Sequence, residues 1–362
     1  MKFSQDAKEY ALDLINIREN NINYNDMYCE LFYYRFCNEK DDINDLMLNQ
    51  GYTSKDAIKY KIEDFFEIAF EEESEIYVDE ALNEEKEDEY LSNPYVKAIN
   101  ISHVKQGKYT LFKDKYEPFE LFARDDIKVL DNYVEQPQIG YFTKPFSFLA
   151  LKERDVTWMS LNPNEINTMK KGIERASGNV LVLGLGLGYF PFMISLKDDV
   201  KDITIIERNK DVIALFKDNI LPNFKHKEKI HIIQDDAIRY VQKLQKDTSF
   251  NYIFADLWHN QEDALRLYIT LVKEERRLNI PTDYWLETSI LAYVRRMIVF
   301  VFLGQLIEGT SDMDFVEAAT IEDSCINGLY FAMKDMEFTS KEQLKEFLND
   351  ASIKELLINE KI

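Results

Sequence analysis

From Asn179 onward the chain alternates between short apolar runs and helical patterns, and this alternation limits the fold more than any other feature. Nearly continuous apolar runs, each followed by an amphipathic segment, predict parallel strands covered by helices on both faces. The predicted strands are 179–186, 202–207, 229–234, 250–258 and 282–287, and the predicted helices are 189–197, 209–221, 236–245 and 261–278. Because the crossovers of parallel strands are right-handed, we expect an α/β fold with an open, doubly wound parallel sheet.

Two segments of different texture precede this alternation. Residues 1–93 carry apolar side chains at three- and four-residue spacings, which predicts an acidic helical region. Residues 94–160 contain short β-branched or aromatic runs between Gly, Pro and Asp, a pattern typical of strands and turns. The sequence therefore predicts three parts, a helical region at 1–93, a small β-rich segment at 94–160, and a sheet domain with C-terminal helices at 161–362.

A helix start is predicted where the sheet domain begins. Asn162 is a favoured N-cap, Pro163 suits the first helical position, and Glu165 stands three residues after the cap. This spacing is that of a capping box, in which the Glu side chain bonds back to the N-cap backbone.

The charge of the chain limits its partners. Its formal charge is −22, and the first 90 residues hold 25 acidic but only nine basic side chains. A general nucleic-acid binder needs a basic face, and so does a protein that docks on an anionic membrane, so neither partner is expected. We interpret the acidic run at 71–89 as a solvated helix face or tether, with a docking site for a basic partner as the alternative.

A cytoplasmic location is expected. The three cysteines, Cys29, Cys37 and Cys325, are too few for a disulfide scaffold, and the first residues form no apolar signal segment. The apolar stretch Met297–Gly304 is too short to span a bilayer.

The glycines after the first predicted strand suggest a ligand. Gly184, Gly186 and Gly188, separated by Leu185 and Leu187, let the backbone turn sharply and approach a ligand closely. The dinucleotide pattern GxGxxG would need glycine at Tyr189, and the Gly-Lys-Ser/Thr of a phosphate-binding loop is absent. The pattern therefore suits a nucleoside without a pyrophosphate, with a tight turn that holds no ligand as the alternative.

Acidic residues end the next two strands. Glu207, which ends the second strand, can accept hydrogen bonds from both ribose hydroxyls of an adenosine, or it can simply face solvent. Asp236, followed by Ala237, can meet the exocyclic amine of adenine, but Asp is also a favoured helix N-cap.

Together these residues resemble a known family. The segment Gly184–Gly188, Glu207, the pair Asp236-Ala237 and Asp256 are similar to motifs I to IV of class I S-adenosylmethionine (SAM)-dependent methyltransferases, over about residues 165–290. The resemblance implies a Rossmann-like SAM site with the methionine end near the glycines and Asp256 beside the sulfonium and the acceptor. The residues it assigns to the cofactor are Gly184, Leu185, Gly186, Gly188, Glu207, Arg208, Asp236, Ala237 and Asp256.

The order of the parts is also similar to that of the spermidine synthase family, in which a β-domain precedes a nucleotide fold. That resemblance implies aminopropyl transfer from decarboxylated SAM. The glycine motif of that family carries an acidic residue, whereas this chain has Leu185 and Leu187 there. Its fourth-strand motif carries two aspartates, whereas this chain has Asp256 alone, followed by Leu257, Trp258 and His259.

Asp256 and His259 are the predicted catalytic residues. Asp256 could orient an acceptor, and His259 could act as general base, with a structural or capping role as the alternative. No metal is expected, although Asp256-Leu-Trp258 resembles the Asp-x-Trp of catechol-type O-methyltransferases, because the Asp-Asn pair that accompanies it there is absent. His231, inside a predicted strand, is expected to be packed.

The sequence thus predicts a SAM-dependent methyltransferase acting on a small-molecule acceptor. A spermidine-synthase-like aminopropyltransferase and a non-catalytic SAM-binding protein are the alternatives. The N-terminal half is expected to build the acceptor site or a homodimer interface, and Trp158, Tyr284 and Trp285 are expected in the core rather than against the acceptor.

Overall fold

The computed structural model describes residues 1–34, 36, 40–67, 78–306 and 320–359. Cys37, residues 71–77 of the acidic run and residues 68–70 of the predicted helical region therefore lie outside the described residues.

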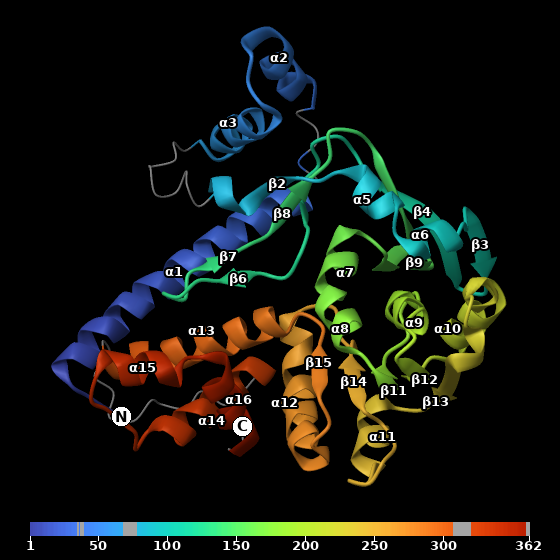
Figure 1. Cartoon of the computed structure of the whole chain (residues 1–362). Coiled ribbons are helices and arrows are strands. Elements are labelled where there is room, and N and C mark those ends of the chain that lie inside the picture. Colours follow the sequence, from blue (N-terminus) through green and yellow to red (C-terminus); the bar gives the residue numbers. More distant parts are fainter. Residues whose placement is uncertain (35, 37–39, 68–77, 307–319, 360–362) are drawn as a thin grey trace.

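A five-stranded parallel sheet lies in the lower right part of Figure 1. Its order is β13-β12-β11-β14-β15, so the chain runs outward from β11 on one side and then on the other. The strands are β11 (Gly178–Leu183), β12 (Val200–Glu207), β13 (Ile230–Gln234), β14 (Tyr252–Ala255) and β15 (Thr282–Tyr284). The predicted α/β fold with a parallel sheet is confirmed, and the carboxyl ends of β11, β12 and β14 lie at one edge.

Helices connect these strands as the apolar pattern predicts. They are α9 (Tyr189–Ser195), α10 (Lys210–Leu215), α11 (Ala237–Lys243) and α12 (Gln261–Leu278), of which α9 and α10 lie on one side of the sheet and α11 and α12 on the other (Figure 1). Two short helices, α7 (Pro163–Thr168) and α8 (Lys170–Arg175), lead into β11. The predicted helix start is confirmed, because Asn162 caps α7 and Pro163 follows it.

The prediction that His231 is packed is wrong. His231 lies on β13, which is the edge strand of the sheet, and its side chain is exposed. It instead contacts the Asp202 carboxylate on β12, with 3.2 Å between Nε2 and Oδ1. Alternating apolar residues show that a strand is present but not that it lies at an edge.

The segment before α7 is rich in strands, as predicted. Four of them form an antiparallel sheet in the order β10-β9-β4-β3. They are β3 (His103–Gln106), β4 (Tyr109–Tyr116), β9 (Phe146–Glu153) and β10 (Val156–Ser160). Smaller sheets are formed by β2 (Leu82–Glu84), β5 (Phe122–Ala123) and β8 (Ile139–Tyr141), and by β6 (Lys128–Val129) and β7 (Glu135–Gln136).

Two elements differ from the prediction. Strand β2 lies inside the region predicted as helical, and α6 (Pro94–Ala98) lies inside the segment predicted as β-rich. Strand β2 exists because it pairs in parallel with β8, and a pairing partner more than 50 residues away leaves no periodicity in a three-residue run. Helix α5 (Glu87–Leu91) lies between the two, in line with the helical prediction.

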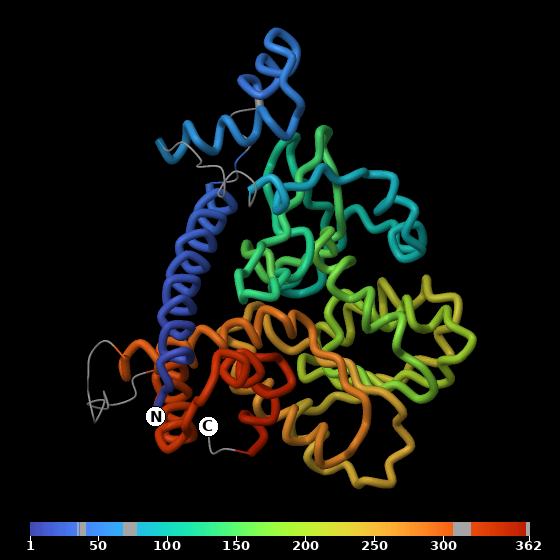
Figure 2. Tube along the Cα trace, turned by 60° about the vertical axis from the view of Figure 1, so that its left-hand side comes forward, coloured from blue at the N-terminus to red at the C-terminus, as the bar shows by residue number. Residues whose placement is uncertain are grey.

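Helices from the two halves of the sequence pack together beside the parallel sheet (Figure 2). The long α1 (Gln5–Tyr33) contacts α13 (Glu287–Leu306) and α15 (Lys341–Phe347). Helices α14 (Ile321–Met333) and α16 (Asp350–Asn359) also contact α13, and β1 (Lys2–Phe3) pairs in parallel with β16 (Glu337–Phe338).

Helix α13 contains the apolar stretch Met297–Gly304, which by itself is too short to span a bilayer. The whole helix is longer than that stretch. The helix is long and apolar enough to cross a membrane by length and composition, while 61% of its most apolar window is buried within the protein. Burial of this degree is typical of the core helix of a soluble protein.

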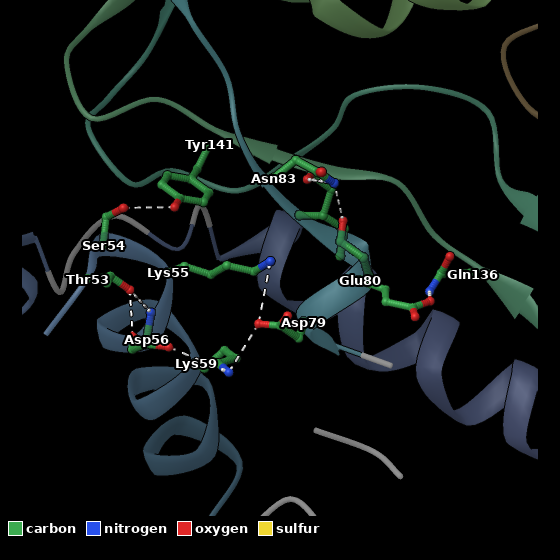
Figure 3. Close-up of polar contacts among 12 residues, drawn as sticks. Thr53, Ser54, Lys55, Asp56, Lys59, Asp79, Glu80, Asn83, Gln136 and Tyr141 are labelled. Atoms are coloured by element: carbon green, nitrogen blue, oxygen red, sulfur yellow. Dashed lines mark hydrogen bonds and ion pairs between the residues drawn. The ribbon is translucent and has the colours of Figure 1, made fainter. Parts of the chain in front are cut away.

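Helices α2 (Lys40–Gln50) and α3 (Ser54–Phe66) form a small lobe, whose apolar residues share a second cluster with residues of α1, β2 and β8. Figure 3 shows how α3 is held: the Ser54 hydroxyl lies 2.9 Å from the Tyr141 hydroxyl on β8, and Lys59 lies 3.2 Å from the Asp79 carboxylate. The Gln136 amide donates to Glu80 at 2.8 Å.

The acidic run is therefore not only a solvated face where the structure describes it. Asp79 and Glu80 make the contacts just described, and Glu85 is buried, where it pairs with Arg124 and accepts a hydrogen bond from Tyr90. Glu80 and Glu85 thus connect the helical region to the β-rich segment, while Asp79 contacts α3 within the helical region.

Candidate functional site

A cavity of about 310 Å³ lies at the carboxyl edge of the parallel sheet. Ligands of open α/β sheets bind at this edge, beside the point where the strand order reverses. All the residues predicted for the cofactor and for catalysis line this one cavity, namely Gly184, Leu185, Gly186, Gly188, Glu207, Arg208, Asp236, Ala237, Asp256 and His259.

The loop after β11 needs its glycines for two different physical reasons. Gly184, Gly186 and Gly188 all have positive φ, at 97°, 53° and 75°. A Cβ on Gly184 would lie 2.0 Å from the Asp256 carbonyl oxygen, and one on Gly188 would lie 2.3 Å from the Phe216 ring. A Cβ on Gly186 would meet no atom within 4 Å.

Close approach to a ligand, the explanation that the sequence suggests for all three glycines, fits only Gly186. At Gly184 and Gly188 the close approach is to the protein itself, while Gly186 alone opens toward free space beside the cavity. A hydrogen bond from the hydroxyl of the buried Tyr95 to the Leu187 carbonyl also holds the loop.

Glu207 ends β12, and backbone groups orient its carboxylate. The Leu185 N–H donates to Oε2 at 3.3 Å, and the Asn209 N–H donates to Oε1 at 2.7 Å. Each carboxylate oxygen can accept a second hydrogen bond, so both oxygens retain capacity for hydroxyl donors in the cavity.

Asp236 lies between β13 and α11, and it is the N-cap of α11. Its Oδ1 accepts the Arg239 N–H at 2.9 Å, which is the capping alternative that the sequence left open. The residue also lines the cavity and is exposed, so the capping role and a contact with a ligand are compatible.

Two carboxylates that line the cavity interact electrostatically, Asp256 after β14 and Glu165 in α7. Desolvation raises the pKa of Asp256 to about 7, and the nearby Glu207 carboxylate adds to this effect. Desolvation also raises the pKa of Glu165 well above its usual value, and the Asp256 charge adds to it. Both groups therefore favour their protonated forms more than ordinary carboxyls do.

Sequence reasoning missed Glu165 as a site residue. Its position three residues after Asn162 predicts a capping role, and the Glu165 N–H does donate to the Asn162 side chain at 3.1 Å. The Glu165 side chain does not bond back to the backbone of Asn162, so only one of the two hydrogen bonds of the predicted capping box is present. No spacing along the chain indicates that this carboxylate faces the cavity.

His259 is held from both sides of its ring. The Trp158 indole N–H donates to Nε2 at 3.0 Å, which places the imidazole hydrogen on Nδ1, 3.2 Å from the Asp263 carboxylate. The His259 backbone N–H also donates to Asp263, the residue that closes the capping box of α12. With Nε2 already occupied, these contacts favour the structural alternative over a general base.

The aromatic residues divide between the cavity and the core. Trp158 and Trp285 line the cavity, while Tyr284 packs against Tyr268 and hydrogen-bonds Glu275. The expectation of core positions therefore fits Tyr284, whereas Trp158 lies where a ligand could contact it. Across the ranges that the structure describes, no group of three His, Cys, Asp or Glu side chains is arranged to hold a metal ion.

No protein-family model matches the chain, and no curated protein matches its sequence. Solved structures with a similar part include spermidine synthase from Thermotoga maritima, at 12% identity and a TM-score of 0.31, over 54% of this chain and 62% of that one. A protein described as a candidate O-methyltransferase from Klebsiella pneumoniae is 13% identical with a TM-score of 0.23, over 29% of this chain and 46% of its own.

A conserved hypothetical protein from Streptococcus pyogenes is 20% identical with a TM-score of 0.23, over 29% of this chain and 62% of its own. This chain spans less than two thirds of each of the three structures. Since all three TM-scores are below 0.5, the residues around the cavity, rather than these similarities, support the function proposed below.

Proposed function

We propose that this chain is a Rossmann-like, SAM-dependent methyltransferase that acts on a small-molecule acceptor. The observation that carries the proposal is the meeting of the glycine loop, Glu207 and Asp236 around one cavity, each from the end of a different neighbouring strand. An adenosyl group needs those three kinds of contact: a closely approaching backbone, an acceptor for a diol and an acceptor for an amine.

The residues present fit such a group. Glu207 has acceptor capacity left on both oxygens for the two ribose hydroxyls, and backbone N–H groups already fix its orientation. Asp236 has a second oxygen for the adenine amine after capping α11. The cavity volume lies at the lower end of the range of small-ligand sites, which is roughly 300–1,000 Å³.

When bound, SAM supplies a methyl group already activated by its sulfonium, so the chain need not form a covalent intermediate. The contribution of the protein is to align the acceptor and to exclude water. Asp256 stands at the end of β14, and we assign it the orientation of the acceptor, while His259 braces the start of α12 through Trp158 and Asp263.

Calorimetric titration with SAM, S-adenosylhomocysteine, decarboxylated SAM and NAD tests the cofactor. We expect SAM and S-adenosylhomocysteine to bind with micromolar dissociation constants and NAD to bind far more weakly. In Glu207→Ala the loss of charge-assisted hydrogen bonds, worth about 1.5–3 kcal/mol, predicts SAM affinity roughly 10- to 100-fold lower.

Glu207 also accepts two backbone N–H groups, so Glu207→Gln, which keeps an acceptor oxygen, serves as a second variant. Glu174→Gln, at an exposed position on α8, is the matched control. SAM affinity that is the same in all three variants and the parent would remove Glu207 from the site.

A second candidate is aminopropyl transfer from decarboxylated SAM, and the acidity of the cavity favours it. Four carboxylates line the cavity against the single guanidinium of Arg208, so a ligand that lacks the methionine carboxylate would meet less repulsion. Tighter binding of decarboxylated SAM than of SAM would select this candidate. SAM binding without turnover of any amine, hydroxyl or thiol acceptor would select a non-catalytic SAM-binding protein.

We further propose that the protein works in the cytoplasm, without a nucleic-acid or membrane partner, and that it can form a homodimer. The acidic composition supports the absence of nucleic-acid and membrane partners, since a charge of −22 disfavours polyanionic surfaces.

A further inference from the structure

A second, smaller cavity of about 140 Å³ lies between helices from the two ends of the sequence. Its walls come from α1, α13 and α14, and α13 contacts both of the other helices. Among the residues that the structure describes, it shares no lining residue with the cavity at the edge of the parallel sheet. The function proposed above therefore leaves this cavity unexplained.

Each of the three helices lines the cavity with one face. Helix α1 supplies Arg18 and Ile22, four residues apart. Helix α14 supplies Glu322 and Ile326 at the same spacing. Residues three and four apart lie on the same face of a helix. Helix α13 follows this rule over two turns, with positions i, i+3, i+4 and i+7 occupied by Tyr293, Arg296, Met297 and Phe300.

The two arginines of the cavity have N–H donors that the protein leaves unused. The Arg18 Nε donates to the Arg296 carbonyl at 3.2 Å, and its Nη1 donates to Glu19 at 2.7 Å. The Arg296 Nε is buried and has no hydrogen-bond partner within the described ranges, although it lies 3.6 Å from the Glu135 carboxylate. Only 19% and 16% of the two side chains is exposed, so water reaches them poorly. Since a guanidinium has five N–H donors, an acceptor in the cavity would be strongly favoured.

Aromatic rings fix the positions of both guanidinium groups. The Arg18 Cζ lies 5.3 Å from the centre of the Phe300 ring, and the Arg296 Cζ lies 5.5 Å from the centre of the Tyr293 ring. Such cation–π contacts hold a guanidinium by its face and leave its N–H edge available. A planar carboxylate suits this edge, because it can accept two parallel hydrogen bonds from one guanidinium.

The rest of the wall selects the charge and the size of the ligand. Two guanidiniums and the Glu322 carboxylate, which accepts a hydrogen bond from Tyr293, give the lining one net positive charge. One carboxylate neutralises this charge, whereas a doubly charged phosphate exceeds it. Apolar side chains complete the wall, namely Ile22, Met297 and Ile326. The volume is below the roughly 300–1,000 Å³ of sites for drug-sized ligands, so the ligand is small.

We propose that this cavity binds a short-chain monocarboxylate. Its carboxylate accepts hydrogen bonds from Arg18 and Arg296, and its hydrocarbon chain lies against the apolar wall. The bound molecule connects α1 to α13 and α14, and so joins the N-terminal helix to the C-terminal ones. This inference goes beyond the proposed function and does not depend on SAM binding.

Calorimetric titration of the full chain with four probes tests the site. The probes are butyrate, 1-butanol, butylamine and inorganic phosphate. 1-Butanol and butylamine share the hydrocarbon chain of butyrate but lack its negative charge, and phosphate has the charge without the chain. We expect butyrate to bind at least about 10-fold more tightly than each of the other three. Absence of butyrate binding, or another probe that binds as tightly as butyrate, would overturn the proposal.

Variants locate the bound probe. Arg18→Gln is expected to weaken butyrate binding at least about 10-fold. Ile22→Phe keeps both guanidiniums but fills the apolar side of the cavity, so the same loss is expected even if Arg18→Gln disturbs the packing of α1. Arg266→Gln, at an exposed position on α12, is the matched control and should change the affinity less than about threefold.

The cavity at the sheet edge also contains a guanidinium, that of Arg208, so Arg208→Gln distinguishes the two cavities. Butyrate binding that is lost in Arg208→Gln but kept in Arg18→Gln would place the probe in the other cavity and contradict the proposal. Binding that both Arg18→Gln and Ile22→Phe leave unchanged would do the same. Binding that these two variants weaken and Arg208→Gln retains would support it.

Discussion

A single methyl group should have different main effects at two glycines of the same loop. At Gly184, φ is 97° and a Cβ would lie 2.0 Å from the Asp256 carbonyl oxygen, a backbone atom that cannot rotate away. Such a backbone conformation costs a residue with a side chain about 1–3 kcal/mol. Forcing extra volume into a packed site adds typically about 1–3 kcal/mol. For Gly184→Ala the middle of these ranges gives a loss of about 4 kcal/mol in unfolding free energy.

At Gly186, φ is 53° and no atom lies within 4 Å of a Cβ. The only cost in the absence of a ligand is the left-handed conformation, about 1–2 kcal/mol. The new methyl group would, however, occupy space beside the cavity that Gly186 lines. Gly186→Ala should therefore remain folded and lose SAM affinity, whereas Gly184→Ala should lose stability first.

Urea unfolding of the parent and both variants, followed by fluorescence, measures the difference, and calorimetric titration with SAM supplies the second readout. The comparison needs equal denaturant dependence in the three proteins, so that the transition midpoints report stability alone. If Gly184→Ala and Gly186→Ala unfold at the same urea concentration, the close approach between the loop and β14 does not constrain the fold as argued. If Gly186→Ala binds SAM normally, the ligand does not approach that part of the loop.

Two further predictions concern Asp256 and His259. The pKa of Asp256 is raised to about 7, so the folded state binds more protons than the unfolded chain between about pH 4 and 7. The ligand-free protein should therefore lose stability as pH rises through this window. Unfolding measured at several pH values should show a flatter dependence in Asp256→Asn. A stability that instead rises across the window would contradict the assignment. His259→Ala should keep kcat within about threefold once an acceptor is known, because Nε2 is bound to Trp158, and should cost about 0.5–1.5 kcal/mol of unfolding free energy for a lost hydrogen bond. A loss of more than 100-fold in kcat, with a changed pH profile, would restore the histidine as a base.

Local pattern was sufficient for the parallel sheet. The first four of its strands contain apolar runs, whereas β15 is only the segment Thr282–Tyr284. Helix α12 begins and ends where the sequence indicates, at Gln261 and Leu278. The predicted site residues meet at one cavity because the carboxyl ends of parallel strands share one edge, so position at a strand end was enough to group Glu207 and Asp256.

Features that depend on distant segments could not be predicted in this way. Glu165 precedes the parallel sheet in the chain and ends none of its strands, and its capping spacing gave it a sufficient local explanation. The environment of His259 depends on Trp158, 101 residues earlier, whose indole occupies the ring nitrogen that a base would need. Likewise β2 has its partner in β8, and the exposure of His231 follows from the strand order alone.

The pairing of β1 with β16 has a consequence for how the chain is made. Lys2 and Phe3 lie against Glu337 and Phe338, and α1 packs on α13 and α15, so β1 and α1 are synthesised long before these partners. At a usual rate of ~5–20 residues per second, a ribosome needs roughly 20 to 70 s to bridge that separation. Over that interval the buried residues of α1 from Ala7 to Ile15 lack the α13 and α15 surfaces that cover them, so a nascent chain of this protein should depend on chaperones until α13 and α15 emerge.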